Sequence, residues 1–186
     1  DLHAGQIQGF FDIPVDNLFS TPIFARHAKK KIKSKNIICV APDVGGTERA
    51  RALGKALNVG LAIVDKRRPK PGQSQVMNVI GNVKGKTCII VDDIIDSGGT
   101  IVNAAKALKD RGAKDVYVYI THGVLSGEAV EKIKKSVIKN LVITDTIDNK
   151  DKIGKAKNIE VLPISSLMGE AIKRISNSTS VSDLFK

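Results

Sequence analysis

The fold is decided by the stretch Thr87-Cys88-Ile89-Ile90-Val91-Asp92-Asp93-Ile94-Ile95-Asp96-Ser97-Gly98-Gly99-Thr100. Its apolar run at 88–91 is typical of a parallel strand buried on both faces. Two adjacent carboxylates, a Gly-rich turn and a helix-like spacing of apolar residues from Ile101 onward follow. A strand that leads through such a turn into a helix forms an anion site, because the first backbone N–H groups of a helix have no partner within it. Because the carboxylates suit vicinal hydroxyls or a divalent cation, the stretch predicts a site for a sugar phosphate.

A second stretch repeats part of this pattern. The segments Asp43-Val44-Gly45-Gly46-Thr47 and Asp96-Ser97-Gly98-Gly99-Thr100 share the motif Asp-x-Gly-Gly-Thr, and each follows an apolar strand and precedes a helix. Sites in open α/β sheets gather at the carboxyl ends of strands, so the two turns are expected to share one crevice. Two anion cradles there would suit a ligand with phosphoryl groups at both ends. Gly-Gly pairs also make plain tight connections, so neither turn is decisive alone.

Strand-like and helix-like segments alternate along the chain. This alternation predicts an α/β fold with a mostly parallel sheet flanked by helices on both faces. Strands are expected at 36–41, 60–64, 88–91, 115–121, 140–144 and 159–163. Helices are expected at 23–33, 48–57, from 101 to the glycine at 112, at 128–135 and at 166–175. Residues 1–22 are expected to be extended and turn-rich, and the polar, basic segment 65–81 is expected to be a long irregular excursion.

Composition limits the function classes. The 186 residues carry a formal net charge of +11, but only 4% are aromatic and none is Trp, which leaves no obvious platform for stacking bases. The lysines are scattered, and an anionic substrate accounts for some of them, so nucleic-acid binding is not favoured. No segment approaches the ~20 apolar residues of a membrane span. Cys39 and Cys88 lie in apolar runs and are expected to be buried free thiols.

Other polar residues are open to two interpretations. Four cations within positions 66–70 could form a cationic flap over a substrate or a solvated basic loop. His3 lacks neighbours with metal-ligand spacing, and a lone histidine is more often structural than a ligand. His122 is equally ambiguous, and His27, beside a lysine run, is expected to be exposed. Neither the P-loop motif nor G-x-G-x-x-G occurs in the chain.

The stretch 91–100 resembles the phosphoribosyl-pyrophosphate motif of type I phosphoribosyltransferases. Residues 1–17, the segment Asp65-Lys66-Arg67-Arg68-Pro69 and the segment Ser180-Val181-Ser182 are similar to ribose-phosphate diphosphokinases, also called phosphoribosyl pyrophosphate synthetases. The resemblance runs nearly end to end. It implies a phosphoribosyltransferase-like domain and an enzyme that transfers diphosphate from ATP to the anomeric hydroxyl of ribose 5-phosphate, giving phosphoribosyl pyrophosphate and AMP. A phosphoribosyltransferase that consumes this product, or a non-catalytic regulatory relative, is the alternative.

The same resemblance implies roles for individual residues. The 5-phosphate would be held by Asp96, Ser97, Gly98, Gly99 and Thr100, and the ribose hydroxyls by Asp92 and Asp93. The pyrophosphate loop would consist of Asp43, Val44, Gly45 and Gly46. A catalytic flexible loop would carry Lys66 and Arg68. The metal would be Mg²⁺, and its expected ligands would be His3 and Asp43. Glu48, beside the pyrophosphate loop, departs from the neutral or basic residue expected there.

Family membership would also place the protein in the cytoplasm, in homo-oligomers such as hexamers built on dimers, with regulatory or interface segments at Gln8, at 16–17 and at 180–182. Partners would be ribose 5-phosphate and ATP, with no nucleic acid and no membrane. Residues 1–18 would be the tail of a missing N-terminal domain, and 19–186 a C-terminal domain whose helix at 166–175 packs on it. The chain alone is therefore expected to be an inactive fragment that carries the ribose 5-phosphate site.

Overall fold

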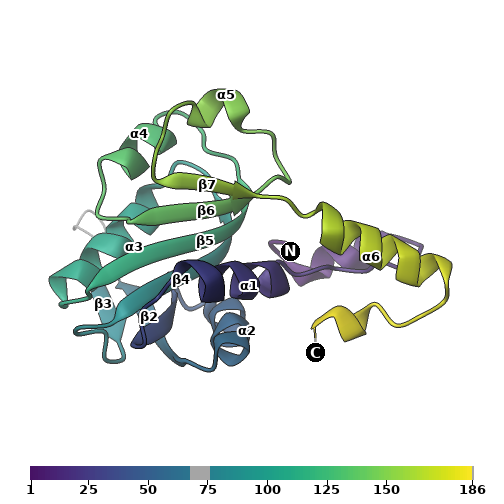
Figure 1. Ribbon diagram of the computed structural model, residues 1–186, viewed down its shortest axis with the longest axis horizontal. Coiled ribbons are helices and arrows are strands. Elements are labelled where there is room, and N and C mark those ends of the chain that lie inside the picture. Colours follow the sequence, from purple (N-terminus) through teal and green to yellow (C-terminus); the bar gives the residue numbers. More distant parts are fainter. Residues whose placement is uncertain (68–75, 186) are drawn as a thin grey trace.

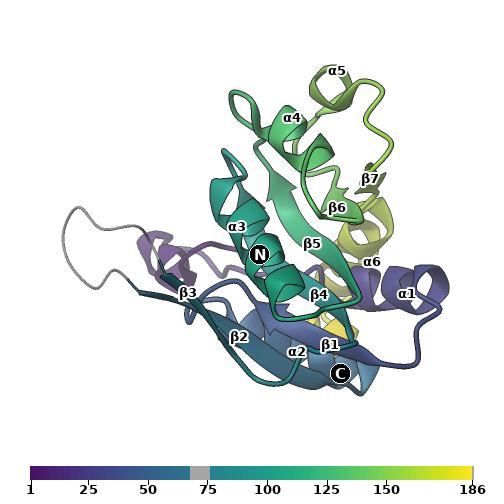
Figure 2. The same ribbon diagram turned by 90° about the vertical axis from the view of Figure 1, so that its left-hand side faces the viewer.

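A seven-stranded sheet with the strand order β3-β2-β1-β4-β5-β6-β7 forms the centre of the computed structural model (Figures 1 and 2). The structure describes residues 1–67 and 76–185. The strands are β1 (Ile37–Ala41), β2 (Gly60–Arg67), β3 (Val76–Ile80), β4 (Thr87–Ile95), β5 (Asp115–Gly123), β6 (Asn140–Thr144) and β7 (Ile159–Leu162). Neighbouring strands pair in parallel except β2 and β3, which are antiparallel. The predicted α/β fold with a mostly parallel sheet is confirmed.

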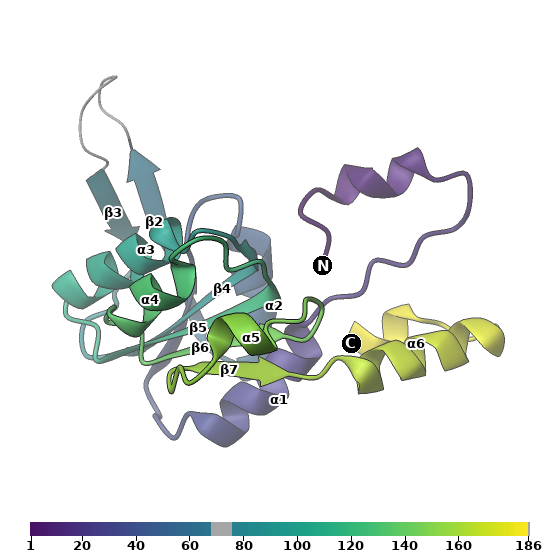
Figure 3. The same cartoon turned by 90° about the horizontal axis from the view of Figure 1, so that it is seen from above.

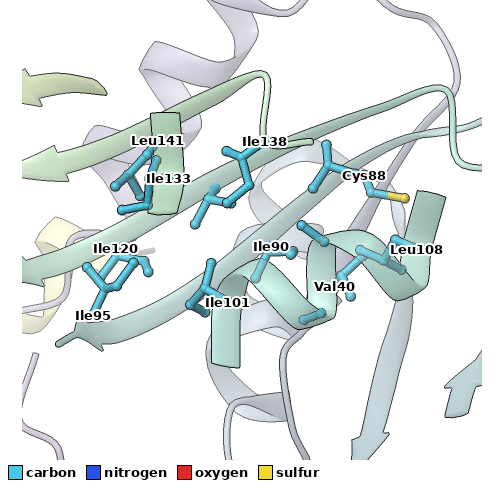
Figure 4. Close-up of a cluster of buried hydrophobic side chains, with 14 of the residues drawn as sticks. Val40, Cys88, Ile90, Ile95, Ile101, Leu108, Ile120, Ile133, Ile138 and Leu141 are labelled. Carbon is cyan, nitrogen blue, oxygen red and sulfur yellow. The ribbon is translucent and has the colours of Figure 1, made fainter. Parts of the chain in front are cut away.

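Helices cover both faces of the sheet. They are α1 (Thr21–Lys31), α2 (Thr47–Leu57), α3 (Gly99–Asp110), α4 (Ala129–Lys134), α5 (Lys150–Ile153) and α6 (Ser165–Ser176), with 3₁₀ helices η1 (Gly5–Phe10) and η2 (Ser182–Phe185). One apolar cluster joins α1 and α2 to the sheet and contains Phe24, Leu53 and Ile89. The other joins α3 and α4 to the opposite face and contains Ile90 and Leu108 (Figure 4). Because successive strand residues point to opposite faces, β4 is buried on both sides, as the apolar run predicts.

Two strands are longer than the sequence indicates. β4 does not end at Val91 but continues through both carboxylates to Ile95, because β5 runs alongside it and pairs with it as far as Gly123. The excursion expected at 65–81 is wrong at its two ends. Here β2 extends to Arg67, and residues Val76–Ile80 return as the antiparallel strand β3. Only the end of β2 is a polar stretch drawn into pairing; β3, Val76-Met77-Asn78-Val79-Ile80, is mostly apolar and was hidden in a segment whose overall composition is polar and basic.

Two segments extend from the same side of the sheet body, namely residues 1–20 and α6 (Figure 3). Only Ala171 of α6 is buried, while Met168, Ile172 and Ile175, which are spaced along one helix face, are exposed. Phe10, Phe11 and Ile13 in the first segment are exposed as well. The described residues leave both apolar surfaces open to solvent.

Two smaller expectations concern the thiols and the helices. Cys39 and Cys88 are buried and free, as predicted, and burial raises the pKa of the Cys39 thiol to about 12. None of the described helices has both the length and the apolar character needed to cross a bilayer.

Candidate functional site

The two Asp-x-Gly-Gly-Thr turns lie at the carboxyl ends of adjacent strands. One turn follows β1 and the other follows β4, and these strands pair in parallel with Val40 opposite Ile90. The chain leaves β1 toward β2 on one side, whereas β4 leads to β5 on the other. The strand order therefore reverses between β1 and β4, which is where open α/β sheets form their ligand crevice.

The turn before α3 is an open backbone cradle. Gly98 adopts a left-handed conformation with φ of +76° at the N-cap of α3, and no side chain caps this helix. The side chains of Asp96, Ser97 and Thr100 are exposed. The first backbone N–H groups of α3 are thus available to an anion, and the helix dipole favours negative charge at this end.

The turn before α2 is held by its own aspartate. Asp43 Oδ1 accepts a hydrogen bond from the Gly46 N–H at 2.9 Å, and Thr47 Oγ1 donates to the Val44 carbonyl at 2.7 Å. A β-carbon on Gly45 would lie 3.3 Å from Asp43 Oδ1, so a larger residue would press on this bond. One Asp43 oxygen is consequently committed to the turn. Glu48, in the first turn of α2, is exposed.

A carboxylate pair lies between the two turns, at the end of β4. The Asp93 N–H donates to Asp92 Oδ1 at 2.9 Å. Arg49 reaches both carboxylates from α2, with Nη2 2.9 Å from Asp93 Oδ2 and Nη1 3.5 Å from Asp92 Oδ1. The Asp93 side chain is only 2% exposed, against 18% for Asp92. This pair of acids shares one guanidinium, and Asp93 has the closer contact.

Sequence reasoning did not single out Arg49. A signal was present, because a positive residue in the first turn of a helix opposes the helix dipole, which favours acids there. Arg49 therefore needed an acidic partner nearby, and the carboxylates that follow β4 were the candidates.

The two carboxyl groups titrate differently. Burial, reinforced by the neighbouring Asp93, raises the pKa of Asp92 to about 7. Burial would also raise the pKa of Asp93, but hydrogen bonding with His3 and Asp92 and the charge of Arg49 bring it below its ordinary value. Asp93 is therefore ionised at neutral pH, whereas Asp92 titrates near it.

His3 is bound to the carboxylate pair. Its Nδ1 lies 2.8 Å from Asp93 Oδ2, while the ring is 78% exposed. The Leu2 carbonyl before it accepts a hydrogen bond from Arg49 Nη2 at 3.2 Å. The structure thus brings His3 to Asp93, and the resemblance-based pairing of His3 with Asp43 has no direct contact to support it.

The residues before His3 are anchored to the end of β5. Thr121 Oγ1 donates to the Asp1 carboxylate at 2.5 Å, and Ser20 N donates to the same group at 3.1 Å. His122 Nε2 donates to the Asp1 carbonyl at 2.7 Å, and its Nδ1 lies 2.9 Å from Thr146 Oγ1. Burial lowers the pKa of His122. His122 is therefore a structural histidine, which resolves the ambiguity left by the sequence.

The expectation of an exposed His27 is wrong. Its side chain is 15% exposed, because Nδ1 lies 3.0 Å from the Tyr119 hydroxyl and Nε2 lies 3.1 Å from Glu160 Oε1. The lysines of α1 suggested a solvated face, but a strand carboxylate approaches that face from β7.

A magnesium ion would need water or phosphate ligands in addition to the side chains of the described residues. Within that part of the chain, no group of three or more His, Cys, Asp and Glu side chains could hold a metal ion. Mg²⁺ commonly takes one or two carboxylates and completes its shell with water and substrate phosphates. Asp43 has one oxygen outside its turn bond, so the site fits a Mg²⁺ ion that arrives with a phosphate ligand.

A cavity of about 880 Å³ lies beside His3 and Arg49, the two residues that contact Asp93. It lies between residues 1–22, α2 and η2, and its lining includes His3, Gly45, Glu48, Arg49 and Lys55. The 96–100 turn does not line it. Lys66 belongs to β2, but its side chain and the whole of Arg68 lie outside the described residues.

Comparison with known proteins gives a match to one family model and several relatives that are longer than this chain. Residues 67–186 match the phosphoribosyl synthetase-associated domain. A ribose-phosphate pyrophosphokinase of Hyphomonas neptunium is 61% identical over 186 residues, which is 100% of this chain and 60% of that protein. The corresponding enzyme of Bradyrhizobium diazoefficiens is 60% identical, with 58% of its length covered. The chain thus spans less than two thirds of these relatives.

The fold also matches a solved structure. The crystal structure of phosphoribosylpyrophosphate synthetase from Mycobacterium smegmatis superposes with a TM-score of 0.86 and 35% sequence identity, covering 96% of this chain and 57% of that one. Adenine phosphoribosyltransferase from Trypanosoma brucei, at 14% identity and a TM-score of 0.52, shares the fold over 78% of this chain and 63% of its own.

Proposed function

Because this chain belongs to the phosphoribosyl synthetase-associated domain family, we propose that it carries the ribose 5-phosphate site of a ribose-phosphate diphosphokinase. The whole enzyme would transfer the diphosphate of ATP to ribose 5-phosphate, giving phosphoribosyl pyrophosphate and AMP. The observation that carries this proposal is the meeting of two glycine-rich turns and a carboxylate pair at the ends of β1 and β4. The name of the relatives at about 60% identity supports it.

The sugar phosphate would lie along the end of β4. The turn at 96–100 would hold the 5-phosphate through the backbone N–H groups at the start of α3. Asp92, the more accessible acid, would accept hydrogen bonds from ribose hydroxyls, because an ionised carboxylate is an acceptor only. The turn at 43–46 would face the diphosphate. This arrangement would place the anomeric carbon between the two turns.

The reaction would be an in-line displacement at phosphorus. The anomeric hydroxyl oxygen would bond to the β-phosphorus of ATP and give its proton to water, while the bond from that phosphorus to the α–β bridging oxygen would break and AMP would leave with that oxygen. Positioning and electrostatic stabilisation carry most of the catalysis in such transfers. We propose that Lys66 and Arg68 supply cations to the transferred group.

Magnesium is the proposed cofactor. Asp43 would be one of its ligands, and His3 would lie on the side of the ion that faces ATP. When bound, the ion would neutralise charge on the phosphoryl oxygens. The residues of this chain would hold the sugar in place and keep the two turns at a fixed separation. The adenine would be held by the part of the longer relatives that this chain does not match.

A binding experiment tests the sugar-phosphate site in this chain. Calorimetric titration with ribose 5-phosphate should show weak binding that Thr100→Val and Asp92→Asn reduce. Asp110→Asn, at the far end of α3, serves as the control and should bind as the parent chain does. Equal affinity in all four proteins would refute the placement of the sugar at β4.

A kinetic experiment tests the catalytic loop. In a longer chain that is active, Lys66→Ala should abolish AMP release while ribose 5-phosphate still binds, and unchanged turnover would refute the role of Lys66. We predict that the 186 residues alone make no product, so AMP release by them would refute that prediction. Turnover of phosphoribosyl pyrophosphate with a nucleobase instead of ATP would point to a phosphoribosyltransferase.

The remaining partners are also proposals. We propose a homo-oligomer built on dimers, such as a hexamer, that works in the cytoplasm and binds neither nucleic acid nor membrane. Residues 1–18 would then link to a preceding domain, and the exposed face of α6 would pack on it. Light scattering of the longer protein tests the assembly. Titration with DNA at low and high salt tests whether the net positive charge binds nucleic acid, because such binding would weaken steeply with salt.

A further inference from the structure

We propose that Asp93 is a positioning residue for His3, which it holds in the Nδ1–H form so that Nε2 offers a lone pair to a divalent cation and its water shell. The identity of the cation in this inference rests on the proposed function, whereas the contacts among Asp93, His3 and Arg49 do not depend on it. It assigns Asp93 to the nucleotide side of the site and leaves Asp92 as the ribose carboxylate.

The contact between the two residues has the form of a carboxylate that orients an imidazole. Asp93 Oδ2 lies 2.8 Å from His3 Nδ1, and an ionised carboxylate only accepts, so Nδ1 must carry the proton. The carboxylate is 2% exposed, whereas the ring is 78% exposed and lines the cavity beside α2. Among the described residues, none hydrogen-bonds to His3 Nε2. A buried acid thus fixes one nitrogen and leaves the other free.

Arg49 fixes the acid in turn. Its Nη2 lies 2.9 Å from the same Asp93 oxygen, and it also donates to the Leu2 carbonyl next to His3. One guanidinium therefore sets both the carboxylate and the backbone that carries the imidazole. Thr121 and His122 anchor Asp1 at the other end of this short segment. Such outer contacts commonly determine how a histidine meets a metal.

The two acids differ in their contacts. Along β4, Ile89 and Val91 face α1 and α2, while Cys88, Ile90 and also Ile95 face α3, so strand alternation alone does not assign the acids to opposite sides. Asp93 Oδ2 lies 2.8 Å from His3 Nδ1 and 2.9 Å from Arg49 Nη2, whereas Asp92 Oδ1 lies 3.5 Å from Arg49 Nη1. Asp93 is therefore the acid that contacts His3.

The other two histidines provide internal contrasts. His122 donates through Nε2 to a carbonyl, and His27 faces the Glu160 carboxylate through Nε2, with a hydroxyl at Nδ1 in each case. Both rings are consequently Nε2–H tautomers when neutral. The chain has 3 histidines, so the structure predicts one Nδ1–H ring and two Nε2–H rings.

Nitrogen-15 NMR of the histidine-labelled chain measures this directly. At about pH 8, above the ordinary histidine pKa of about 6.5, two-bond couplings should identify a single Nδ1–H ring, and its signal should vanish in His3→Gln. Asp93→Leu should remove the acceptor and convert His3 to a mixture of tautomers. Asp93→Asn, whose amide oxygen can occupy the Oδ2 position, should keep the Nδ1–H form. An Nε2–H tautomer of His3 in the parent chain would overturn the proposal, whether or not the variants fold.

Kinetics in an active longer chain provide the second readout. Asp93→Leu should lower kcat/KM for Mg²⁺–ATP by about 10- to 100-fold, as loss of an outer-shell contact usually does, while the KM for ribose 5-phosphate stays near its parent value. Asp93→Asn should recover most of the loss. A raised KM for ribose 5-phosphate in Asp93→Leu would overturn the proposal and return Asp93 to the sugar. If the longer chain makes no phosphoribosyl pyrophosphate, the proposed function fails, but the tautomer measurement still decides the role of Asp93.

Discussion

Asp92→Asn should stabilise the protein at neutral and alkaline pH. The pKa of Asp92 is raised from 3.8 to about 7, chiefly by burial and then by the adjacent Asp93. The folded protein consequently binds more protons than the unfolded chain between these two values, and its stability falls as the pH rises through this window. The amide of asparagine can still accept the hydrogen bond from the Asp93 N–H, but it has no charge to bury.

The size of the effect follows from the pKa shift. A rise of about 3 units corresponds to a ceiling of about 4 kcal/mol at 1.36 kcal/mol per unit. The Asp92 side chain is 18% exposed and titrates together with Asp93, so its charge is partly solvated. A gain on the order of 1–2 kcal/mol above about pH 7 is therefore expected, shrinking toward zero near about pH 4.

Urea unfolding followed by circular dichroism measures this gain. Asp92→Asn and the parent chain would be compared from about pH 4 to about pH 8, the window that linkage defines. Asp96→Asn removes an exposed carboxylate four residues further along and should change the unfolding free energy little at any pH. The interpretation of Asp92 as a carboxyl group whose charge is costly to bury would be refuted if Asp92→Asn were less stable than the parent at about pH 8. It would also be refuted if the difference in unfolding free energy did not vary with pH.

Four further substitutions test the fold. Gly98→Ala should cost about 1–2 kcal/mol in urea unfolding, because φ is +76° and an L-residue is strained there, although the new β-carbon would meet Ala129 only at 3.8 Å; an unchanged midpoint would contradict this. Ile133→Ala should cost about 2–5 kcal/mol, since the residue is fully buried. Ile172→Ala on α6, 61% exposed, should change stability by less than about 0.5 kcal/mol, and equal losses would show that α6 is part of the core. Glu160→Gln should destabilise the protein at neutral pH, because the hydrogen-bond donors around Glu160 outweigh burial and lower its pKa in the folded state. The difference should begin to shrink as the pH falls past the ordinary glutamate pKa and disappear below the lowered folded-state pKa, and thermal melts at neutral and acid pH would show whether it persists in acid.

The sequence was sufficient for the sheet and for most helices because each strand is a short apolar run followed by turn residues. The strand Asn140–Thr144 was predicted to the residue, and α2 to within one residue. The pattern failed where polar residues take part in backbone pairing. Residues 76–80 are mostly apolar and carry a strand signal of their own, but the polar, basic residues before them obscure it, and their antiparallel pairing with β2 cannot be read from local composition.

The site was predicted as two turns and two acids but without the contacts that organise them. Adjacent turns follow from the topology of parallel strands, and sequence reasoning reached that point. The His3–Asp93 contact joins residues 90 positions apart, and the Arg49 contacts join α2 to β4 and to residues 1–3. Local patterns carry no information on such pairs. Only the unfavourable position of Arg49 at a helix N-terminus hinted at them.

Under the proposed function, the arrangement would let one strand serve both ends of a bifunctional ligand. Asp92 and Asp93 are covalent neighbours, so any shift of the β4 end would move the proposed sugar contact and the His3 contact together. Arg49 touches both acids and the Leu2 carbonyl, which makes the distance between the two half-sites a property of one buried cluster instead of two mobile loops. For a displacement at phosphorus, in which misplacement of reacting atoms by about 1 Å can cost about 100-fold in rate, such a cluster is a reason to place the two acids side by side on a strand rather than in separate turns.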